Sequence, residues 1–305
     1  MLFRSFENRS AINVSTLNYS HRGAKKLNDL GIPIFFIVGN RDLFHRHTRE
    51  IFSTIQLSEF SNFNIINEPT VVEKIEGNPL VCPFLFHDEY PQLIQYINSK
   101  TWWGHFEFKG FVVTGYNVTM PTGPDAQDFK GPEIFSGHFH KRQINDNVTY
   151  IGNTFPTNFG DAGDDNRGMM MFDHIGMKKT FLNWDACPKY MKVRLTQLLD
   201  DPSILPTNAR VKCVIDVPIS YEESTLLRST FMDEYQLREF SMEESQDIND
   251  ALTGADMDID AATSELPDDI KLDSVNDLVA QMINSINTPH IENGMLLQIY
   301  QQLKV

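Results

Sequence analysis

The sequence predicts an α/β protein, because its first part reads as a helix followed by a buried strand. Residues 12–30 place apolar side chains at helical spacing and are followed by Gly31, a residue that commonly ends helices. Residues 32–38 form a nearly continuous apolar run, which is typical of a strand buried on both faces of a parallel sheet. At 305 residues and 41% hydrophobic, the chain can bury a core in one large domain or two smaller ones.

Further short elements are predicted after this helix and strand. Residues 64–86 alternate strand-like runs around a Gly-Asn-Pro turn at 77–79, which indicates a hairpin, and residues 90–97 indicate a short helix. Residues 120–130 form a loop. Residues 160–166 predict a tight acidic turn, since they lack the ligand alternation and closing glutamate of a calcium loop. More strands are expected at 111–113, 134–135, 148–151, 169–172 and 179–184.

The pattern changes after Pro202 and Pro206. A strand at 210–217, a helix at 221–233 and a strand at 237–240 predict a small βαβ unit. We therefore divide the chain into residues 1–200, a small domain at 207–241, an acidic linker at 242–271 and C-terminal helices at 272–305. The linker composition is typical of disorder. The last segment carries an apolar stripe that either folds back on its own domain or docks on another protein, formed by Val275, Leu278, Val279, Met282, Ile283 and Ile286.

The composition is typical of a cytoplasmic protein whose cysteines are reduced. No run approaches 18 apolar residues, the N-terminus lacks the apolar core of a signal peptide, and the three cysteines are far apart. Residues 232–278 hold fifteen acidic against two basic residues, a balance of −13 out of the total of −15. The remainder of the chain is nearly neutral, so the net charge says little about the surface around a candidate site. The sequence also has no stripe of basic residues that would indicate nucleic-acid binding.

Three short segments place candidate ligands directly after apolar runs, where strands are expected to end. They are Gly-Asn-Arg-Asp at 39–42, Gly-His-Phe-Glu at 104–107 and Gly-His-Phe-His at 137–140. Polar groups at the carboxyl ends of strands form sites in α/β proteins, and imidazole is a good ligand for transition metals. His138 and His140, two residues apart on an extended segment, are expected to point the same way.

Each of these residues also has a purely structural interpretation. Asn40 is also typical of a turn or cap at a strand end, and His105 of a packed core histidine. Asp42 is either a group that orients a neighbouring ligand or a plain surface charge. The histidine pair taken alone is equally typical of a solvated loop.

The order of the three segments resembles the later motifs of calcineurin-like metallophosphoesterases. Over roughly residues 1–240 the sequence resembles one branch of this family more closely, the SbcD-type DNA exonuclease subunits, including the recombination endonuclease subunits of tailed phages. The similar segments are Gly104-His105-Phe106-Glu107, Ser136-Gly137-His138-Phe139-His140, Tyr150-Ile151-Gly152-Asn153 and Arg167-Gly168-Met169-Met170-Met171-Phe172-Asp173.

This resemblance implies an α/β metallophosphoesterase β-sandwich flanked by helices, with a small βαβ capping domain and C-terminal helices that bind a partner. It implies two divalent metal ions, Mn²⁺ by expectation, with Asn40, His105 and His138 on one ion and His140 on the other. The implied activity is hydrolysis of phosphodiester bonds at double-stranded DNA ends in recombination or repair. The implied partner is an SbcC-like ABC-type coiled-coil ATPase, a homodimer is a further possibility, and the location is the cytoplasm, that of the host if a phage encodes the chain.

Two departures from the family pattern matter. Arg41 stands where the family has a histidine that assists the departing oxygen; arginine can steady a phosphate but cannot act as an acid near neutral pH. Neither the D-x-H nor the Gly-Asp motif occurs upstream of Asn40, and Met1 falls near the place of the bridging aspartate. A mis-called start, a split gene or a degenerate copy would each give this pattern, and we expect the chain alone to cleave poorly. The alternatives are a non-catalytic scaffold for DNA and the ATPase, and a phosphomonoesterase of the same superfamily.

Overall fold

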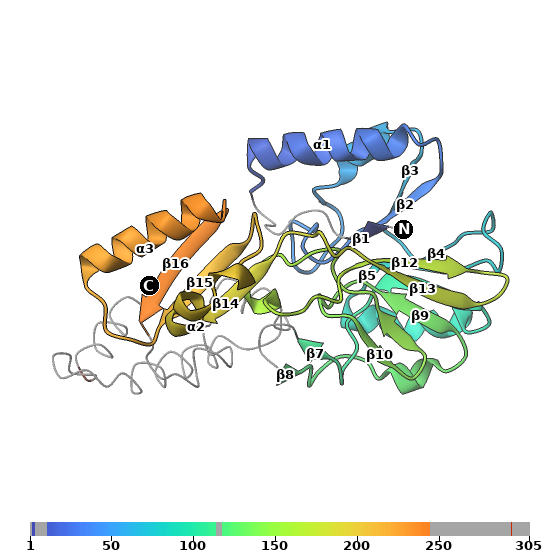
Figure 1. Cartoon of the computed structure of the whole chain (residues 1–305). Coiled ribbons are helices and arrows are strands. Elements are labelled where there is room, and N and C mark those ends of the chain that lie inside the picture. The colour runs from blue at the N-terminus through green and yellow to red at the C-terminus, as the bar shows by residue number, and fades with distance from the viewer. Residues whose placement is uncertain (1, 4–10, 114–117, 245–293, 295–305) are drawn as a thin grey trace. The chain divides into compact units, whose positions relative to one another are not determined.

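The computed structural model describes residues 2–3, 11–113, 118–244 and 294, and it is an α/β fold (Figure 1). The helix and strand predicted at 12–38 form as α1 (Val14–Asn28) and β2 (Ile34–Ile37). Asn13 caps α1, because its side chain accepts a hydrogen bond from the Ser15 N–H. Gly31 follows at φ +70°, the left-handed conformation that glycine adopts without strain. Within the described ranges, no helix combines the length and apolarity that crossing a bilayer requires.

A six-stranded sheet forms the centre of the fold, in the order β10-β11-β9-β6-β5-β4. Its inner strands are parallel: β5 (Leu80–Phe84), β6 (Thr101–His105), β9 (Glu133–Ser136) and β11 (Val148–Tyr150). Its edge strands β4 (Thr70–Val71) and β10 (Gln143–Asn145) run antiparallel to their neighbours. β4 and β5 are the hairpin predicted at 64–86, and the continuous apolar runs of β5 and β6 are fully buried, as a parallel sheet requires.

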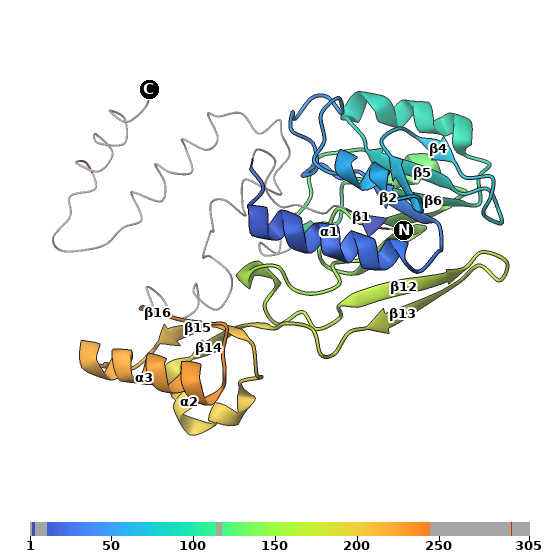
Figure 2. The same cartoon turned by 90° about the horizontal axis from the view of Figure 1, so that it is seen from above.

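A second, three-stranded parallel sheet carries the first candidate motif. It consists of β1 (Leu2–Phe3), β2 and β3 (Phe63–Ile66), and both views show α1 lying along it (Figures 1 and 2). Ala24 of α1 packs with Ile34 and Phe36 of β2 near η1 (Ile55–Glu59). From the other side of β2 and β3, Ile37 and Ile66 pack against the central sheet in one shared core with Val81, Trp103 and Phe135.

Two further groups of elements cover the central sheet. The ribbon of β12 (Gly168–Asp173) and β13 (Lys178–Asn183) packs Phe172 on Trp103 and Phe135, with ring centroids 5.7 and 4.8 Å apart. On the opposite face, η2 (His87–Tyr96) and η3 (Ala126–Phe129) enclose the largest core cluster. η2 begins earlier than the helix predicted at 90–97, because the Glu89 carboxylate accepts the Phe86 N–H and starts the first turn there. The remaining short elements are β7 (Val112–Val113), β8 (Val118–Thr119) and η4 (Phe159–Asp161).

The small βαβ unit forms, but it starts before the predicted boundary. Its parallel sheet contains β14 (Tyr190–Arg194), β15 (Arg210–Ile215) and β16 (Glu239–Glu244). The helix α3 (Tyr221–Glu234) lies on one face of this sheet (Figure 1). Along the chain, α2 (Leu195–Asp200) and η5 (Pro202–Ile204) connect β14 to β15. Placing residues up to 200 in the large domain was wrong, since Val193, Leu195 and Leu198 are buried in the core of the small unit with Val211 and Phe240. The predicted helices at 272–305, apart from residue 294, and nearly all of the linker at 242–271 lie outside the described residues.

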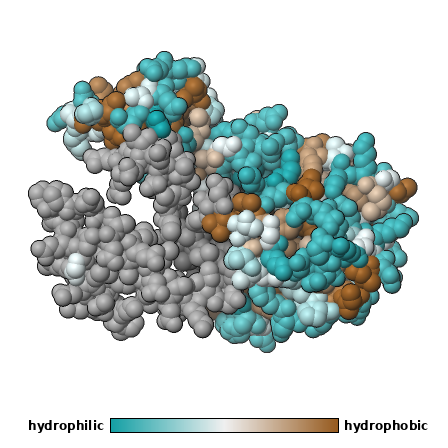
Figure 3. Space-filling view, turned by 90° about the horizontal axis from the view of Figure 1, so that it is seen from below, coloured by the Kyte–Doolittle hydropathy of each residue, from teal (hydrophilic) through white to brown (hydrophobic). Residues whose placement is uncertain are grey.

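The cysteines and the surface of the described residues have ordinary properties. The three cysteines are free and buried, and burial raises the pKa of the Cys82 thiol. Figure 3 shows the described part of one face as mainly hydrophilic, with hydrophobic residues in small separate groups. Such scattered groups are normal for a protein surface.

Candidate metal site at the strand ends

Asn40, His105 and His138 meet where β2, β6 and β9 end. The sheets are joined here, because the Phe84 N–H at the end of β5 donates to the Val38 carbonyl just after β2, at 2.8 Å. Oδ1 of Asn40 lies 3.2 Å from Nε2 of His105, and the rings of His105 and His138 are 5.1 Å apart and nearly perpendicular. All three residues are buried. The structure therefore brings together three predicted ligands that are far apart in the sequence.

The loop that carries Asn40 is shaped by Asp42. The Asp42 carboxylate accepts the Gly39 N–H at 2.8 Å, and its carbonyl accepts the Ser53 N–H at the same distance. Asp42 is completely buried, so the interpretation as a plain surface charge is wrong. Its contacts hold the turn in which Asn40 stands. Arg41 is also buried, directly beside Asn40.

Glu107 is the residue that sequence reasoning missed at this site. Its Oε2 lies 3.0 Å from Nε2 of His138, and its Oε1 lies 3.7 Å from Nε2 of His87. Glu107 stands two residues after His105, a spacing that puts two side chains on one side of an extended segment and could have indicated a shared site. The carboxylate therefore links the buried His138 to the half-exposed His87.

Two buried tyrosines fix the backbone on either side of Glu107. The Glu107 N–H donates to the Tyr90 hydroxyl at 2.8 Å, and the Phe108 N–H donates to the Tyr150 hydroxyl at 3.0 Å. The Tyr150 hydroxyl in turn donates to the Phe106 carbonyl at 3.0 Å. Burial raises the pKa of both tyrosines, so they stay neutral and keep these bonds.

The electrostatics of Glu107 and His138 determine which atom of His138 can bind a ligand. Burial raises the pKa of Glu107, but the hydrogen bond and charge of His138, with a contribution from His87, outweigh it and hold the pKa below its usual value. An ionised Glu107 accepts a hydrogen bond, so Nε2 of His138 carries the proton. Nδ1 of His138 is buried and has no hydrogen-bond partner among the described residues. The neutral tautomer of His138 that matches this bond presents the lone pair of Nδ1, as a metal-binding histidine oriented by a carboxylate does.

His140 lies in a different environment from His138. The expectation that both point the same way assumed an extended segment, but β9 ends at Ser136 and the chain bends after it. The two contacts lead to different carboxylates, because His138 meets Glu107 whereas Nδ1 of His140 lies 3.9 Å from Oδ1 of Asp161.

A buried ion-pair network surrounds His140. Nη2 of Arg167 lies 3.0 Å from Asp161 and 3.0 Å from Asp164, and its Nη1 donates to the His140 carbonyl at 2.7 Å. The side chains of Asp161 and Arg167 are fully buried. The segment predicted as a tight acidic turn at 160–166 therefore contains one buried carboxylate, Asp161, and one partly buried carboxylate, Asp164, both held by an arginine, which its composition alone did not indicate.

The side chains of Asn40, His105 and His138 have the donor types of a divalent-ion site. Two ligand atoms that both lie about 2.1 Å from one ion are roughly 3.0–3.4 Å apart, depending on its geometry. The 3.2 Å between Asn40 Oδ1 and His105 Nε2, which are in hydrogen-bond contact here, falls in this range, and His138 offers Nδ1. Within the described residues, no three histidine, cysteine, aspartate or glutamate side chains are grouped so that they could hold a metal ion. The trio differs from such a group because one ligand is an amide oxygen.

The residues around His140 do not complete a second ion site in the part of the chain that the structure describes. Asp161 is the carboxylate next to His140, and Arg167 already neutralises it. A carboxylate that forms a buried pair with a guanidinium would lose that pair on binding a metal. Among the described residues, His140 therefore has no neighbouring carboxylate that is free of an arginine partner.

The chain is similar in sequence to a phage exonuclease subunit. It is 30% identical over 174 residues to exonuclease subunit 1 of Enterobacteria phage T4. The matched region is 55% of this chain and 50% of that protein, so the chain spans about half the length of the relative it matches. No protein-family model matches. A cluster of buried metal-type ligands at strand ends thus occurs in a chain that resembles half of an exonuclease subunit.

Proposed function

We propose that this chain is a subunit of a metal-dependent nuclease that hydrolyses phosphodiester bonds at DNA ends during recombination or repair. The observation that carries the proposal is the meeting of Asn40, His105 and His138, with Glu107 holding His138 in one tautomer. The sequence similarity to an exonuclease subunit favours DNA over other phosphate esters. It also favours this activity over phosphomonoester hydrolysis.

In this proposal Asn40, His105 and His138 hold a divalent ion, with Mn²⁺ the expected metal and His140 the only further predicted ligand for a second. When bound, such an ion neutralises charge on the phosphate and lowers the pKa of a bound water. Asp42 holds the turn that presents Asn40, and Glu107 keeps the proton of His138 on Nε2. Arg41, beside Asn40, stabilises phosphate charge but donates no proton near neutral pH.

The proposed partner is an SbcC-like ABC-type ATPase with a coiled coil. The name of the phage relative describes a subunit, which supports an assembly of this kind. The apolar stripe that includes Leu278 and Met282 is the proposed docking segment and lies outside the described residues. The assembly would act in the cytoplasm, that of the host if a phage encodes it.

Cleavage of linear duplex DNA with Mn²⁺, by the chain together with its ATPase, tests the proposal. We expect weak cleavage by the chain alone, because the described ligands suffice for one ion. In the assembly, His138→Ala should remove cleavage, whereas His21→Ala, an exposed histidine on α1, should leave it unchanged. Metal-dependent cleavage that survives His138→Ala would contradict the proposed site.

Arg41 favours a second candidate function, a scaffold that binds DNA and the ATPase without cleaving. Replacing it by the histidine of the family pattern separates the two. If Arg41 weakens an active site, Arg41→His should raise the rate, by up to about 10²–10⁴-fold where general acid catalysis operates. If Arg41 clamps the phosphate, the rate should fall. Absence of cleavage with either residue at position 41 would leave the scaffold as the function.

A further inference from the structure

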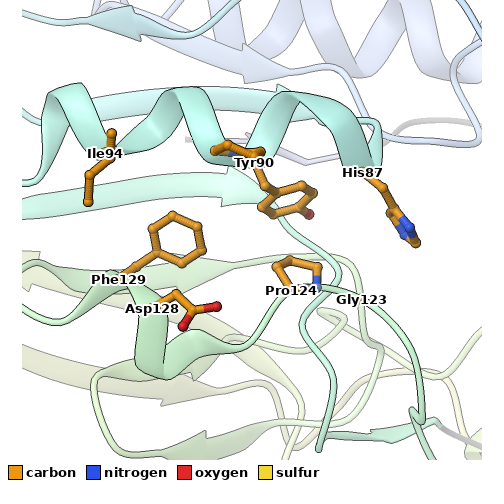
Figure 4. A pocket seen from close by; sticks show the side chains of 8 residues that line it. His87, Tyr90, Ile94, Gly123, Pro124, Asp128 and Phe129 are labelled. Atoms are coloured by element: carbon orange, nitrogen blue, oxygen red, sulfur yellow. The ribbon is translucent and has the colours of Figure 1, made fainter.

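A cavity of about 430 Å³ lies between η2 and the segment 123–129, and it is lined by His87, whose Nε2 lies 3.7 Å from Oε1 of Glu107. Figure 4 shows Tyr90 and Ile94 of η2 pointing toward Phe129 and Pro124 across this space. The volume lies in the range of small-molecule pockets, ~300–1,000 Å³. Its wall consists of His87, Tyr90, Pro91, Ile94, Gly123, Pro124, Asp128 and Phe129.

The wall combines apolar surfaces with few polar groups. Pro91, Ile94, Pro124 and Phe129 are apolar, and rings such as those of proline and phenylalanine stack well on a planar ligand. Asp128 is exposed and supplies a carboxylate. An ionised carboxylate accepts hydrogen bonds and donates none. The chemistry fits a flat heterocycle that carries N–H donors on its edge.

The cavity is built on rigid parts of the fold. Phe129 is buried and packs on Trp102, with ring centroids 5.6 Å apart. Gly123 adopts φ +102°, and a Cβ there would lie 2.7 Å from the Glu107 carbonyl oxygen, so the loop packs directly on the backbone of Glu107. A ligand in the cavity would therefore meet a wall that is already formed, which lowers the entropy cost of binding.

One carboxylate connects the cavity with the candidate metal site. His87 lines the cavity and lies 3.7 Å from one oxygen of Glu107, whose other oxygen lies 3.0 Å from His138. A strand whose phosphate faced His138 would thus have a neighbouring nucleotide beside His87.

From this arrangement we propose that the cavity receives one unpaired nucleobase of the DNA strand whose phosphate faces Asn40, His105 and His138. The proposal rests on the proposed nuclease function and adds the state of the substrate. A base still paired within a duplex cannot enter such a pocket, so the favoured substrate is a frayed or single-stranded end. Asp128 accepts hydrogen bonds from exocyclic amino groups, which favours cytosine and adenine over thymine.

Binding of short single-stranded oligonucleotides, with EDTA present so that no cleavage occurs, tests the proposal. The probe carries 2-aminopurine, whose fluorescence responds to stacking, and a matched oligonucleotide carries an abasic residue at the same position. Ile94→Trp fills the cavity, and Gln95→Trp adds the same side chain on η2 outside the cavity wall. Ile94 is 57% exposed, so the substitution leaves the core intact.

We expect Ile94→Trp to weaken binding of the base-containing probe about 5- to 150-fold, which corresponds to the ~1–3 kcal/mol of base stacking. Gln95→Trp should have no effect, and Ile94→Trp should have no effect on the abasic probe, because the two changes remove the same interaction. Asp128→Asn should reduce the preference for cytosine over thymine.

Equal effects of Ile94→Trp on the two probes, or no binding of either probe by the wild-type chain, would overturn the proposal. Equal effects would show that the cavity does not contact the base at that position. Failure of the nuclease proposal is seen separately, as absence of Mn²⁺-dependent cleavage by the assembly, whereas the base-binding result is obtained without metal.

Discussion

His138 and His140 stand two residues apart, yet they belong to two regions in which carboxylates have different partners. His138 lies in the strand-end cluster, which we define as Asn40, His105, Glu107 and His138, where a carboxylate faces an imidazole. His140 lies beside the arginine network, which we define as Asp161, Asp164 and Arg167, where the carboxylates face a guanidinium.

The difference teaches what each carboxylate can do. An arginine-held carboxylate has a permanent, buried counter-charge, so it stabilises structure and is a poor metal ligand. A carboxylate held by a histidine orients the ring and leaves the second ring nitrogen for a ligand. The first region therefore has the chemistry of a site, whereas the second has that of a structural clamp on the loop that follows β9.

Replacing the arginine of the clamp should give the largest effect. Arg167→Met leaves Asp161 buried without its counter-charge, so we expect the free energy of unfolding to fall by ~3–5 kcal/mol. Urea denaturation measures it. Arg210→Met is the matched control, since the Arg210–Glu239 pair is about half exposed and should contribute less than ~1 kcal/mol. Equal small losses for both variants would show that the network does not stabilise the fold.

Removing the charge of Glu107 should give an intermediate effect, confined to the strand-end cluster. Glu107→Gln keeps the shape but weakens the orientation of His138, so we expect the Mn²⁺ affinity to fall ~10–100-fold. Titration calorimetry measures the affinity. Glu133→Gln, which removes a carboxylate paired with Lys179 away from the cluster, should leave it unchanged. An unchanged affinity for Glu107→Gln would mean that Glu107 does not orient a ligand.

A pH titration should give the smallest effect and extends the comparison to a second arginine-held carboxylate. Arg49 donates to Glu89 and to the Phe84 carbonyl, so it ties the loop after the Asn40 motif to η2. Burial raises the pKa of Glu89, but its hydrogen bonds with Arg49 and the Phe86 N–H outweigh this and hold the pKa below the usual 4.5. Because the pKa is lower in the folded state, Glu89 stabilises the fold above about pH 4.5, and this contribution is lost as the pH falls through the folded pKa.

The stability advantage of the wild type over Glu89→Gln should therefore be full at pH 6 and shrink below pH 4.5. Unfolding curves of both proteins across this range measure it. A difference that stays constant with pH would show that the Glu89 charge is not linked to folding.

Sequence patterns predicted the helices and strands whose signals lie within a few neighbouring residues. α1 and β2 formed as expected, because helical spacing, the Asn13 cap and Gly31 act within a few residues. The boundary of the small unit was misplaced, because β14 joins that unit only through its pairing with β15, which no local signal carries.

For the candidate site, the sequence by itself determined that Asn40, His105 and His138 lie at or just after the ends of buried strands, since apolar runs mark strands and their ends. Only the tertiary structure decided that Glu107 faces His138 and that Arg167 holds the carboxylate beside His140. The reason is physical: both pairings join residues brought together by the packing of separate segments, and their strength comes from burial, which exists only once those segments have packed.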